Sequence, residues 1–523
     1  MLRKKLLFVA TMLIAAVLAF GACGNGNGDD TPDEVTPPEQ NVTDDTQAND
    51  TQADDTQAED PPAANGMTGR VTIGTGENPV MLTALMEVFN QRHPGIEVDV
   101  MHTGEWMGNE TMARIVAAGE MPCIIFLQNP QFPVQNNWVI DLQPFVDNTP
   151  DFDVPEAFTY QLTLGDELIG VPWLVFMHGV VVNLSLLDAE NIPRPDYFWT
   201  LEDMEYIIRR GTRHGESIGI NNVADFLKHV PPQMNHNLGW SGFNHTARRY
   251  ELGDDWVRAA TIAADLVQGG FTLGEQLAEI GNYWYLEEGS PERAASQEAR
   301  QALLWDLLGL ETDWHALMTG QFATWMDFSW GMNFHTNELF TGFEWDFFPF
   351  PAYNRGDTPR PGIVVDPIGI TTAAPYPEAA WEVVRFLTFD HEGLNARYDI
   401  IDNWDQAEAM ERWPGWAEHL YPENMYTTSI PPTTNTAIID RWVAMNDASP
   451  GLRFIMGNMG IGYMDGFKVT PGYEQAFYRT ISDTWRAEVM TGQRTAADIV
   501  GEVESIANDI IRDSFESIGI MVP

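Results

Sequence analysis

Cysteine is nearly absent from this chain of 523 residues, which carries only Cys23 and Cys123. Since Cys23 ends an export signal and is the expected site of a lipid, Cys123 has no partner left, and an intrachain disulfide is excluded. Cys123 opens the apolar run Cys123 to Leu127, where a buried structural cysteine is expected rather than a nucleophile.

Basic residues are also scarce, with 28 Lys and Arg against 76 Asp and Glu and a formal net charge of −48. The N-terminal signal contributes +3 and the acidic segment after it −12, which leaves −39 for the folded part. Such a chain repels a phosphate backbone, so nucleic acid is excluded as a partner. With 44% apolar residues and 18 Trp, the chain can build a core for two or three domains.

Motifs for nucleotides and metals are missing. Gly74-Thr75-Gly76 and Gly460-Ile461-Gly462 both lack the third glycine of a dinucleotide-binding loop, and the chain has no phosphate-binding loop. His236 and His245 are nine residues apart, without the close spacing of a zinc motif. We therefore expect neither a cofactor nor a metal.

The N-terminus has the pattern of a bacterial lipoprotein export signal. Arg3-Lys4-Lys5 is charged, Leu6 to Phe20 is apolar, and Gly21-Ala22-Cys23 is a small-residue cleavage site that ends in cysteine. The apolar run is shorter than the roughly 20 residues that a membrane-spanning helix needs. A lipid on Cys23 would hold the protein on the extracytoplasmic face of the cell membrane, as suits a bacterium with a single membrane. Phe20 stands where such signals usually have Leu, which leaves plain secretion as the alternative.

Residues 24–67 contain no Lys or Arg and carry three near copies of a five-residue repeat, the first of which is Asp44-Asp45-Thr46-Gln47-Ala48. Such a stretch cannot bury enough apolar surface to offset its ordering entropy. We expect an acidic disordered tether that links the signal, residues 1–23, to a folded part beginning near Thr68.

The folded part opens with alternating strand and helix patterns. We expect strands at Arg70 to Gly74, at Ile96 to Val100 and at Cys123 to Leu127, with helices at Val80 to Arg92 and Asn109 to Ala118 between them. The unbroken apolar third strand is typical of a parallel sheet covered on both faces. This is a βαβαβ start.

Later segments continue the α/β pattern. Thr200 with Asp203 is typical of a capping box, and Pro377 of a first helical turn. The other expected strands are 168–173, 179–183, 322–326, 345–350 and 361–371, and the other expected helices are 255–267, 472–490 and 495–514.

Several segments, taken in this order, resemble the family 1 extracellular solute-binding proteins of ABC sugar importers, a maltose-binding-protein-like family. The segments are Gly74 to Asn78, Phe89 to Val98, Ala117 to Pro122, Gly170 to Trp173, Val182 to Leu187 and Pro377 to Leu387. The chain departs from the family at Pro122-Cys123, where Pro-Asp is common, and in inserted material around Leu273 to Leu304.

The resemblance implies an α/β fold of two discontinuous lobes, joined by hinge strands, that close over a ligand. The chain would cross between lobes near Leu174 to His178 and near Val364 to Pro367. Lobe 1 would comprise residues 68–176 with 366–435, and lobe 2 residues 177–365 with 436–523. The implied function is capture of a carbohydrate, an oligosaccharide given the many aromatic residues, and its delivery by a monomeric binding protein to ABC transporter permease subunits, with no bond made or broken.

Ligand-binding candidates are aromatic, amide and carboxylate side chains at the carboxyl ends of strands and at the hinge. They are Glu77, Asn78, Trp106, Gln128 with Asn129, Trp173, His178, Trp240, Asn244, Asp327, Trp330 and Asp366. Trp330 also sits where the family commonly places a ligand-facing tryptophan. For each tryptophan core packing is the alternative, for each Asp a structural hydrogen bond, and for Glu77 a helix cap. Trp413 and Trp416 could line the lip of the cleft or anchor a turn.

Two other functions share these features. A ligand-sensing partner of a membrane receptor would use the same cleft, so only its partners distinguish it. An extracellular glycoside hydrolase needs a pair of carboxyl groups at a set separation, which a sequence does not measure.

Overall fold

The computed structural model describes residues 67–76, 79–103, 109–280, 286, 290–331, 342–413, 424–446 and 449–522. The predicted signal, Cys23 and the tether lie outside these residues. The chain divides into two units, residues 1–59 with 277–300 and residues 60–276 with 301–523. In the first unit, the described residues form the end of α10 and the start of α11, within the predicted insertion. All that follows concerns the second unit.

Strands and helices alternate at the start of the described chain, and helices predominate after β11. The strands are β1 Gly69–Thr75, β2 Ile96–His102, β3 Ile124–Phe126, β4 Thr163–Leu164, β5 Glu167–Leu168, β6 Val171–Asn183, β7 Phe243–Asn244, β8 Arg249–Tyr250, β9 Thr324–Phe328, β10 Trp345–Pro349, β11 Gly362–Ile370 and β12 Tyr463–Met464. The α-helices are α2 Pro79–Arg92, α3 Asn109–Ala117, α4 Gln131–Gln135, α5 Gln143–Asp147, α6 Leu184–Ala189, α7 Leu201–Gly211, α8 Phe226–Met234, α9 Gly253–Gln268, α10 Gly274–Glu279, α11 Pro291–Leu308, α12 Asp313–Thr319, α13 Pro377–Thr388, α14 His391–Asp402, α15 Gln406–Arg412, α16 Asn424–Thr428, α17 Thr436–Met445, α18 Pro450–Gly457 and α19 Ala496–Ser517.

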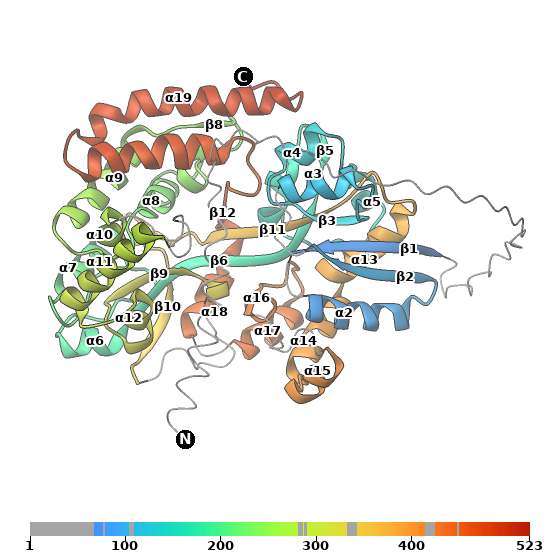
Figure 1. The fold of residues 1–523 in the computed structure, drawn as a ribbon, viewed down its shortest axis with the longest axis horizontal. Helices are drawn as coiled ribbons and strands as arrows, with labels where there is room; N and C mark the ends of the chain where they lie inside the picture. The colour runs from blue at the N-terminus through green and yellow to red at the C-terminus, as the bar shows by residue number, and fades with distance from the viewer. Residues whose placement is uncertain are drawn as a thin grey trace, which may run out of the picture. The chain divides into compact units, whose positions relative to one another are not determined.

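One mixed sheet organises the described residues. Its strand order is β10-β6-β11-β3-β1-β2, with β9 also paired to β6 and β12 to β11. β1 runs parallel to β2 and β3, whereas β11 runs antiparallel to β3 and β6. Figure 1 shows β6 and β11 side by side between the strands β1 to β3 and the helices α6 to α9.

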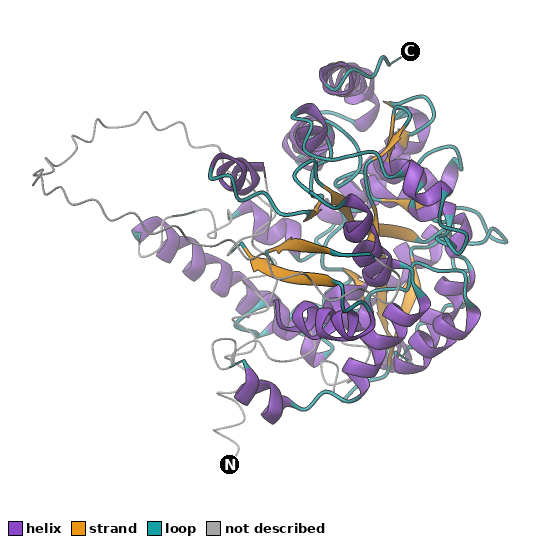
Figure 2. Cartoon of the chain, turned by 90° about the vertical axis from the view of Figure 1, so that its right-hand side faces the viewer, coloured by secondary structure: helices purple, strands orange, loops and turns teal. Residues whose placement is uncertain are grey.

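The predicted βαβαβ start is confirmed: three strands and two helices follow at the expected places, within one or two residues. Helix α13 begins with Pro377 at its first position and buries the predicted apolar face of Ala380, Val383, Val384 and Leu387. Figure 2 shows helices on both sides of the strands, as the apolar third strand predicts.

The prediction of two separate strands at 168–173 and 179–183 is wrong, because 171–173 and 179–183 both belong to the single strand β6, and Leu168 ends β5. All thirteen residues of β6 are buried. Its first part pairs with β11 and its second part lies between β9 and β10, so a partner is present along the whole length. Continuous pairing keeps the strand extended where the sequence suggested an interruption.

The two segments predicted to cross between lobes lie directly beside each other. Leu174 pairs with Asp366 and Phe176 with Val364, and the register shifts between Asp366 and Pro367. A third segment joins them, because the backbone N–H of Ile430 donates to the carbonyl of Val175 at 2.7 Å.

The other strand-and-helix group also follows the predicted signals. The capping box at Thr200 is present: the backbone N–H of Thr200 donates to Asp203 at 2.8 Å, and that of Asp203 to the Thr200 hydroxyl at 3.3 Å. The helix predicted at 472–490 is present at 473–490, and most of it is π-helical, in the segments η8 Glu474–Ser482 and η9 Trp485–Met490. Helix α19 packs on α9 and η8, and α18 packs on β10.

Candidate functional site

The candidate site lies where β6 exchanges one neighbouring strand for another. His178 is opposite Gly362 of β11 on one side and opposite Phe328 of β9 on the other. Helix α8 and strand β12 bring His229 and Tyr463 to the same point. Four elements distant in sequence therefore place side chains around one residue of β6.

Five rings pack in a row here. Phe328 stacks on Trp330 with centroids 4.0 Å apart, and on His178 at 4.2 Å. Trp240 lies parallel to Phe328 at 6.4 Å, and Phe176 meets Trp330 edge-on at 5.2 Å. Phe176, His178 and Trp240 are buried, whereas Phe328 and Trp330 are partly exposed. The row therefore offers an aromatic surface at its Phe328–Trp330 end.

Buried polar contacts run behind this row. Nδ1 of His178 contacts Nε2 of His229, whose Nδ1 lies 2.8 Å from the hydroxyl oxygen of Tyr463. Burial lowers the pKa of His178 to about 4 and the pKa of His229 well below its usual value. Both imidazoles are therefore neutral at pH 7.

Lysine occurs in the folded part only at this site. The sequence contains four lysines, of which Lys4 and Lys5 belong to the export signal and Lys228 and Lys468 to the folded part. Nζ of Lys228 lies 2.7 Å from Oδ1 of Asp225, and the two side chains are 12% and 11% exposed. Burial opposes the charge on each of them, but their pairing outweighs it: the pKa of Asp225 falls below its usual range and the pKa of Lys228 rises.

The second lysine joins the crossing strand β11 to strand β3. The ammonium of Lys468 contacts Oδ1 of Asp366, which is 3% exposed. Nζ of Lys468 also lies 5.6 Å from the ring centroid of Phe126, at the end of β3. Burial raises the pKa of Asp366, and the charge of Lys468 acts in the opposite direction.

Two further carboxyl groups, Asp327 and Asp465, form no ion pair within the described part of the chain. The carboxyl of Asp465 interacts electrostatically with Lys228 and Lys468, and burial raises its pKa. Asp327 is partly exposed, accepts a hydrogen bond of 2.7 Å from the N–H of Phe328, and has its pKa raised by burial to about 7. Four carboxyl groups thus accompany two ammonium groups.

Strands β3 and β6 and helix α16 contribute a second aromatic wall to the site. Trp173 of β6 is buried, and its ring meets those of Phe126 and Tyr426 edge-on at 6.2 and 6.1 Å. Gln128 follows β3 and is partly exposed. Because Phe126 also contacts Lys468, this wall adjoins the charged groups.

Three buried nitrogens of the site have no hydrogen-bond partner among the described residues: Nε1 of Trp173, Nε1 of Trp240 and Nε2 of His178. Nε2 of His178 lies 3.9 Å from Oδ2 of Asp225, beyond hydrogen-bond distance. A buried polar group without a partner costs about 1–3 kcal/mol.

Of the predicted ligand residues, the structure brings together His178, Trp240, Asp327, Trp330 and Asp366, and Trp173 adjoins them. Whether they contact a ligand stays a prediction.

Two of the predicted amide side chains form hydrogen bonds with backbone groups nearby in the sequence. Oδ1 of Asn244 accepts from the N–H of Ala247 at 2.9 Å, within the β7–β8 hairpin, and Oδ1 of Asn129 accepts from the N–H of Gln131 at 3.1 Å. Glu77, Asn78, Trp106 and Trp416 lie outside the described residues. Trp413 stacks parallel to Trp404 at 6.4 Å.

Sequence reasoning missed Asp225, Lys228, Asp465 and Lys468. Asp225 and Lys228 lie at the start of α8, and the other two lie after β12, so no single segment groups them. The rarity of lysine was the available signal, because a chain that places nearly all its cations on arginine retains lysine at two buried positions.

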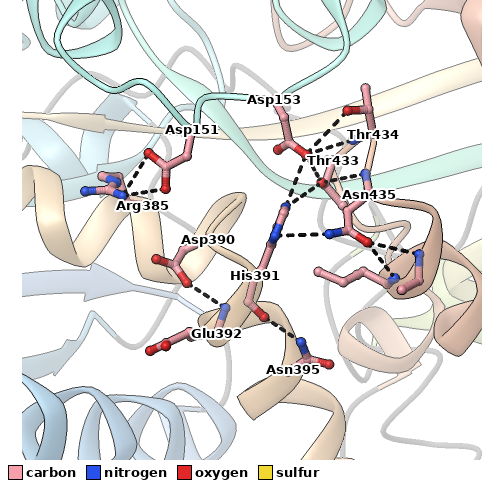
Figure 3. Close-up of polar contacts among 12 residues, drawn as sticks. Asp151, Asp153, Arg385, Asp390, His391, Glu392, Asn395, Thr433, Thr434 and Asn435 are labelled. Carbon is pink, nitrogen blue, oxygen red and sulfur yellow. Dashed lines mark hydrogen bonds and ion pairs between the residues drawn. The ribbon is translucent and has the colours of Figure 1, made fainter.

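A second polar cluster, shown in Figure 3, anchors the segment that follows Ile430. The Thr433 hydroxyl donates to Oδ2 of Asp153, and Nε2 of His391 lies 3.2 Å from the same oxygen. Asn435 caps α17 and places its Nδ2 3.1 Å from Nδ1 of His391. These groups bond to one another, although Oδ1 of Asp153 has no hydrogen-bond partner among the described residues, and we assign the cluster a structural role.

Within the described residues, no group of three or more His, Cys, Asp or Glu side chains could hold a metal ion. None of the described helices is both long and apolar enough to cross a membrane.

The fold resembles solved structures of sugar-binding proteins. An ABC substrate-binding protein from Listeria monocytogenes, in complex with cycloalternan, matches with a TM-score of 0.57 at 16% identity, over 85% of this chain and 99% of that one. A sugar transporter from Rhizobium etli in an open conformation matches with a TM-score of 0.59 at 11% identity, over 84% and 99%. The sugar-binding protein MalE from Xanthomonas citri matches with a TM-score of 0.57 at 14% identity, over 85% and 98%.

The chain has the two-lobed α/β fold of these solved structures. This confirms the predicted fold class, with β6 and β11 as the strands that pass between the two groups of elements. No family model and no curated protein matches the sequence.

Proposed function

We propose that this protein captures a carbohydrate, specifically an oligosaccharide, between two lobes and delivers it to the permease of an ABC transporter. The observation that carries the proposal is the partly exposed Phe328–Trp330 stack beside paired ammonium and carboxyl groups at the crossing of β6 and β11. Aromatic faces pack on the C–H faces of sugar rings, while ammonium groups donate to hydroxyls and carboxylates accept from them. Solved proteins of the same fold that bind sugars support the choice of ligand class.

The proposed mechanism is closure without chemistry. A ligand that contacts lobe 1, residues 68–176 with 366–435, and lobe 2, residues 177–365 with 436–523, stabilises the closed state by its additional contacts there. Paired β6 and β11 are the strands about which the lobes would rotate. The permease then recognises the closed form, and the protein acts as a monomer without a cofactor.

Calorimetric titration with a panel of malto-, cello- and galacto-oligosaccharides tests this function. Saturable heat with the sugar recovered intact supports a binding protein. Recovery of shortened sugars would make the protein a glycoside hydrolase, and absence of heat across the panel would refute carbohydrate as the ligand class.

We also propose that a lipid on Cys23 anchors the protein on the extracytoplasmic face, with the acidic residues 24–67 as its tether. Mass spectrometry of the N-terminal peptide of the membrane fraction tests this. We expect a diacylglyceryl adduct on Cys23, and release of a Cys23→Ser variant into the medium. An unmodified Cys23 in a secreted protein contradicts the anchor and leaves the binding proposal intact.

A further inference from the structure

The charged groups of the site are unevenly matched. Lys228 is paired with Asp225 at 2.7 Å, and Lys468 is in contact with Asp366, so each lysine has one carboxylate of its own. Asp465 interacts electrostatically with both lysines but forms no ion pair within the described part of the chain.

Asp327 adds a fourth carboxyl group next to Phe328, and Asp225 is the charged group near it. Arginines do not compensate for this excess: none forms an ion pair with any of the four carboxyl groups within the described part of the chain. The two nearby imidazoles are buried and neutral. Above about pH 7, where Asp327 is ionised as well, the site therefore carries more negative than positive charge.

Such a site treats neutral and acidic sugars differently. Sugar hydroxyl groups accept hydrogen bonds from ammonium groups and donate them to carboxylates. Because the hydroxyls are uncharged, their binding leaves the net charge of the site unchanged. A carboxylate on the ligand would meet lysines that are already neutralised and carboxyl groups that repel it. Like charges brought together at an interface cost several kcal/mol, and buried charges are screened by salt much less than exposed ones.

We propose that this site selects uncharged sugars and rejects uronic acids, with Asp327 and Asp465 as the residues that determine the selection. The inference rests on the proposed function and specifies the class of sugar. Both residues suit isosteric tests: Oδ1 of Asp465 accepts from the N–H of Phe467 at 2.9 Å, and Oδ1 of Asp327 accepts from the N–H of Phe328. An asparagine at either position keeps that acceptor and removes the charge.

The test, carried out at pH 8 so that Asp327 is ionised, compares each neutral malto-, cello- or galacto-oligosaccharide with its counterpart oxidised at C6 to the uronate. Oxidation keeps the ring stereochemistry and replaces the C6 hydroxymethyl group with a carboxylate. Calorimetry on the full chain should give affinities about tenfold or more weaker for the oxidised member. Equal or tighter binding of the oxidised member overturns the proposal. Absence of heat for both members of every pair refutes the proposed function itself, and this inference with it.

Two variants and a salt series assign the selectivity to named groups. Asp327→Asn and Asp465→Asn should each narrow the ratio of neutral to oxidised affinity by about threefold or more, while Glu311→Gln, an exposed carboxylate outside the site, should leave it unchanged. Asp327 forms no ion pair with either lysine within the described part of the chain, so its variant serves if Asp465→Asn fails to fold. The ratio should persist at 0.5 M NaCl (about a 4 Å screening length). A ratio that vanishes in salt, or that neither asparagine variant changes, contradicts a local origin.

Discussion

Nζ of Lys228 lies 2.7 Å from Oδ1 of Asp225, and both side chains are nearly buried. Removing one member leaves the other charge buried and unpaired, which typically costs about 3–5 kcal/mol. We expect Lys228→Met to lower the free energy of unfolding by an amount in this range, measured by urea denaturation.

The double variant Asp225→Asn with Lys228→Met is the matched control. Because it removes both charges, it should lose less stability than the sum of the two single variants. Strict additivity would contradict the pairing.

Trp330 should matter for binding and little for folding. Its ring is partly exposed and stacks on Phe328, so Trp330→Ala removes ligand contact without opening the core. We expect about a tenfold loss of oligosaccharide affinity, equivalent to about 1.4 kcal/mol, with little change in melting temperature. Trp305→Ala, at a tryptophan 63% exposed and outside the site, should keep wild-type affinity. Wild-type affinity in Trp330→Ala would remove this residue from the site.

Asp327 should make stability depend on pH in a direction opposite to an ordinary paired aspartate. Its pKa is raised to about 7 in the folded protein, so between about pH 4 and pH 7 the folded state binds a proton that the unfolded state has lost. Its contribution is therefore favourable at low pH and is lost as pH rises through 7. Relative to wild type, Asp327→Asn should gain about 1–2 kcal/mol of stability between pH 4 and pH 8, since partial exposure limits the effect. Urea denaturation at both pH values measures this, and a difference independent of pH would contradict it.

The close packing of β6 against β10 leaves no room for a side chain at Gly179. A Cβ atom there would lie 2.5 Å from Cζ of Phe347 and 2.7 Å from the carbonyl oxygen of Phe348. Gly179→Ala should destabilise the fold by about 1–3 kcal/mol through overpacking. Gly457→Ala, in α18 with nothing within 4 Å of the new Cβ, should be neutral or slightly stabilising. Equal melting temperatures for the two variants would contradict the close contact.

Local signals in the sequence predicted most of the elements, because they depend on neighbouring residues. Apolar periodicity located α2 and α13, and the Thr200 and Asp203 pair located the start of α7. The prediction of an interruption within β6 was wrong because the strand depends on contacts with residues distant in the sequence. Its continuity depends on pairing with β9, β10 and β11, and these strands lie far away in the sequence.

The residues of the candidate site also divide into those that local signals predicted and those that depend on distant contacts. His178, Trp330 and Asp366 were predicted because each stands at a strand end or crossing, a position that the sequence pattern reveals. Lys228 and Lys468 were missed because their significance lies in sharing one site with four carboxyl groups, and that proximity arises only when α8, β11 and the segment after β12 come together.

The most direct test of where the ligand binds uses the rarity of lysine in this chain. The folded part has no lysine other than Lys228 and Lys468, so acetylation by an amine-reactive ester, followed by mass spectrometry, reports on the site alone. The ligand is an oligosaccharide that gives saturable heat, added so that about 90% of the protein is bound. The acetylation rate of both lysines should then fall by about tenfold, as mass action requires if only free protein reacts. Binding heat with unchanged acetylation rates at both lysines would place the sugar elsewhere and contradict the proposed site.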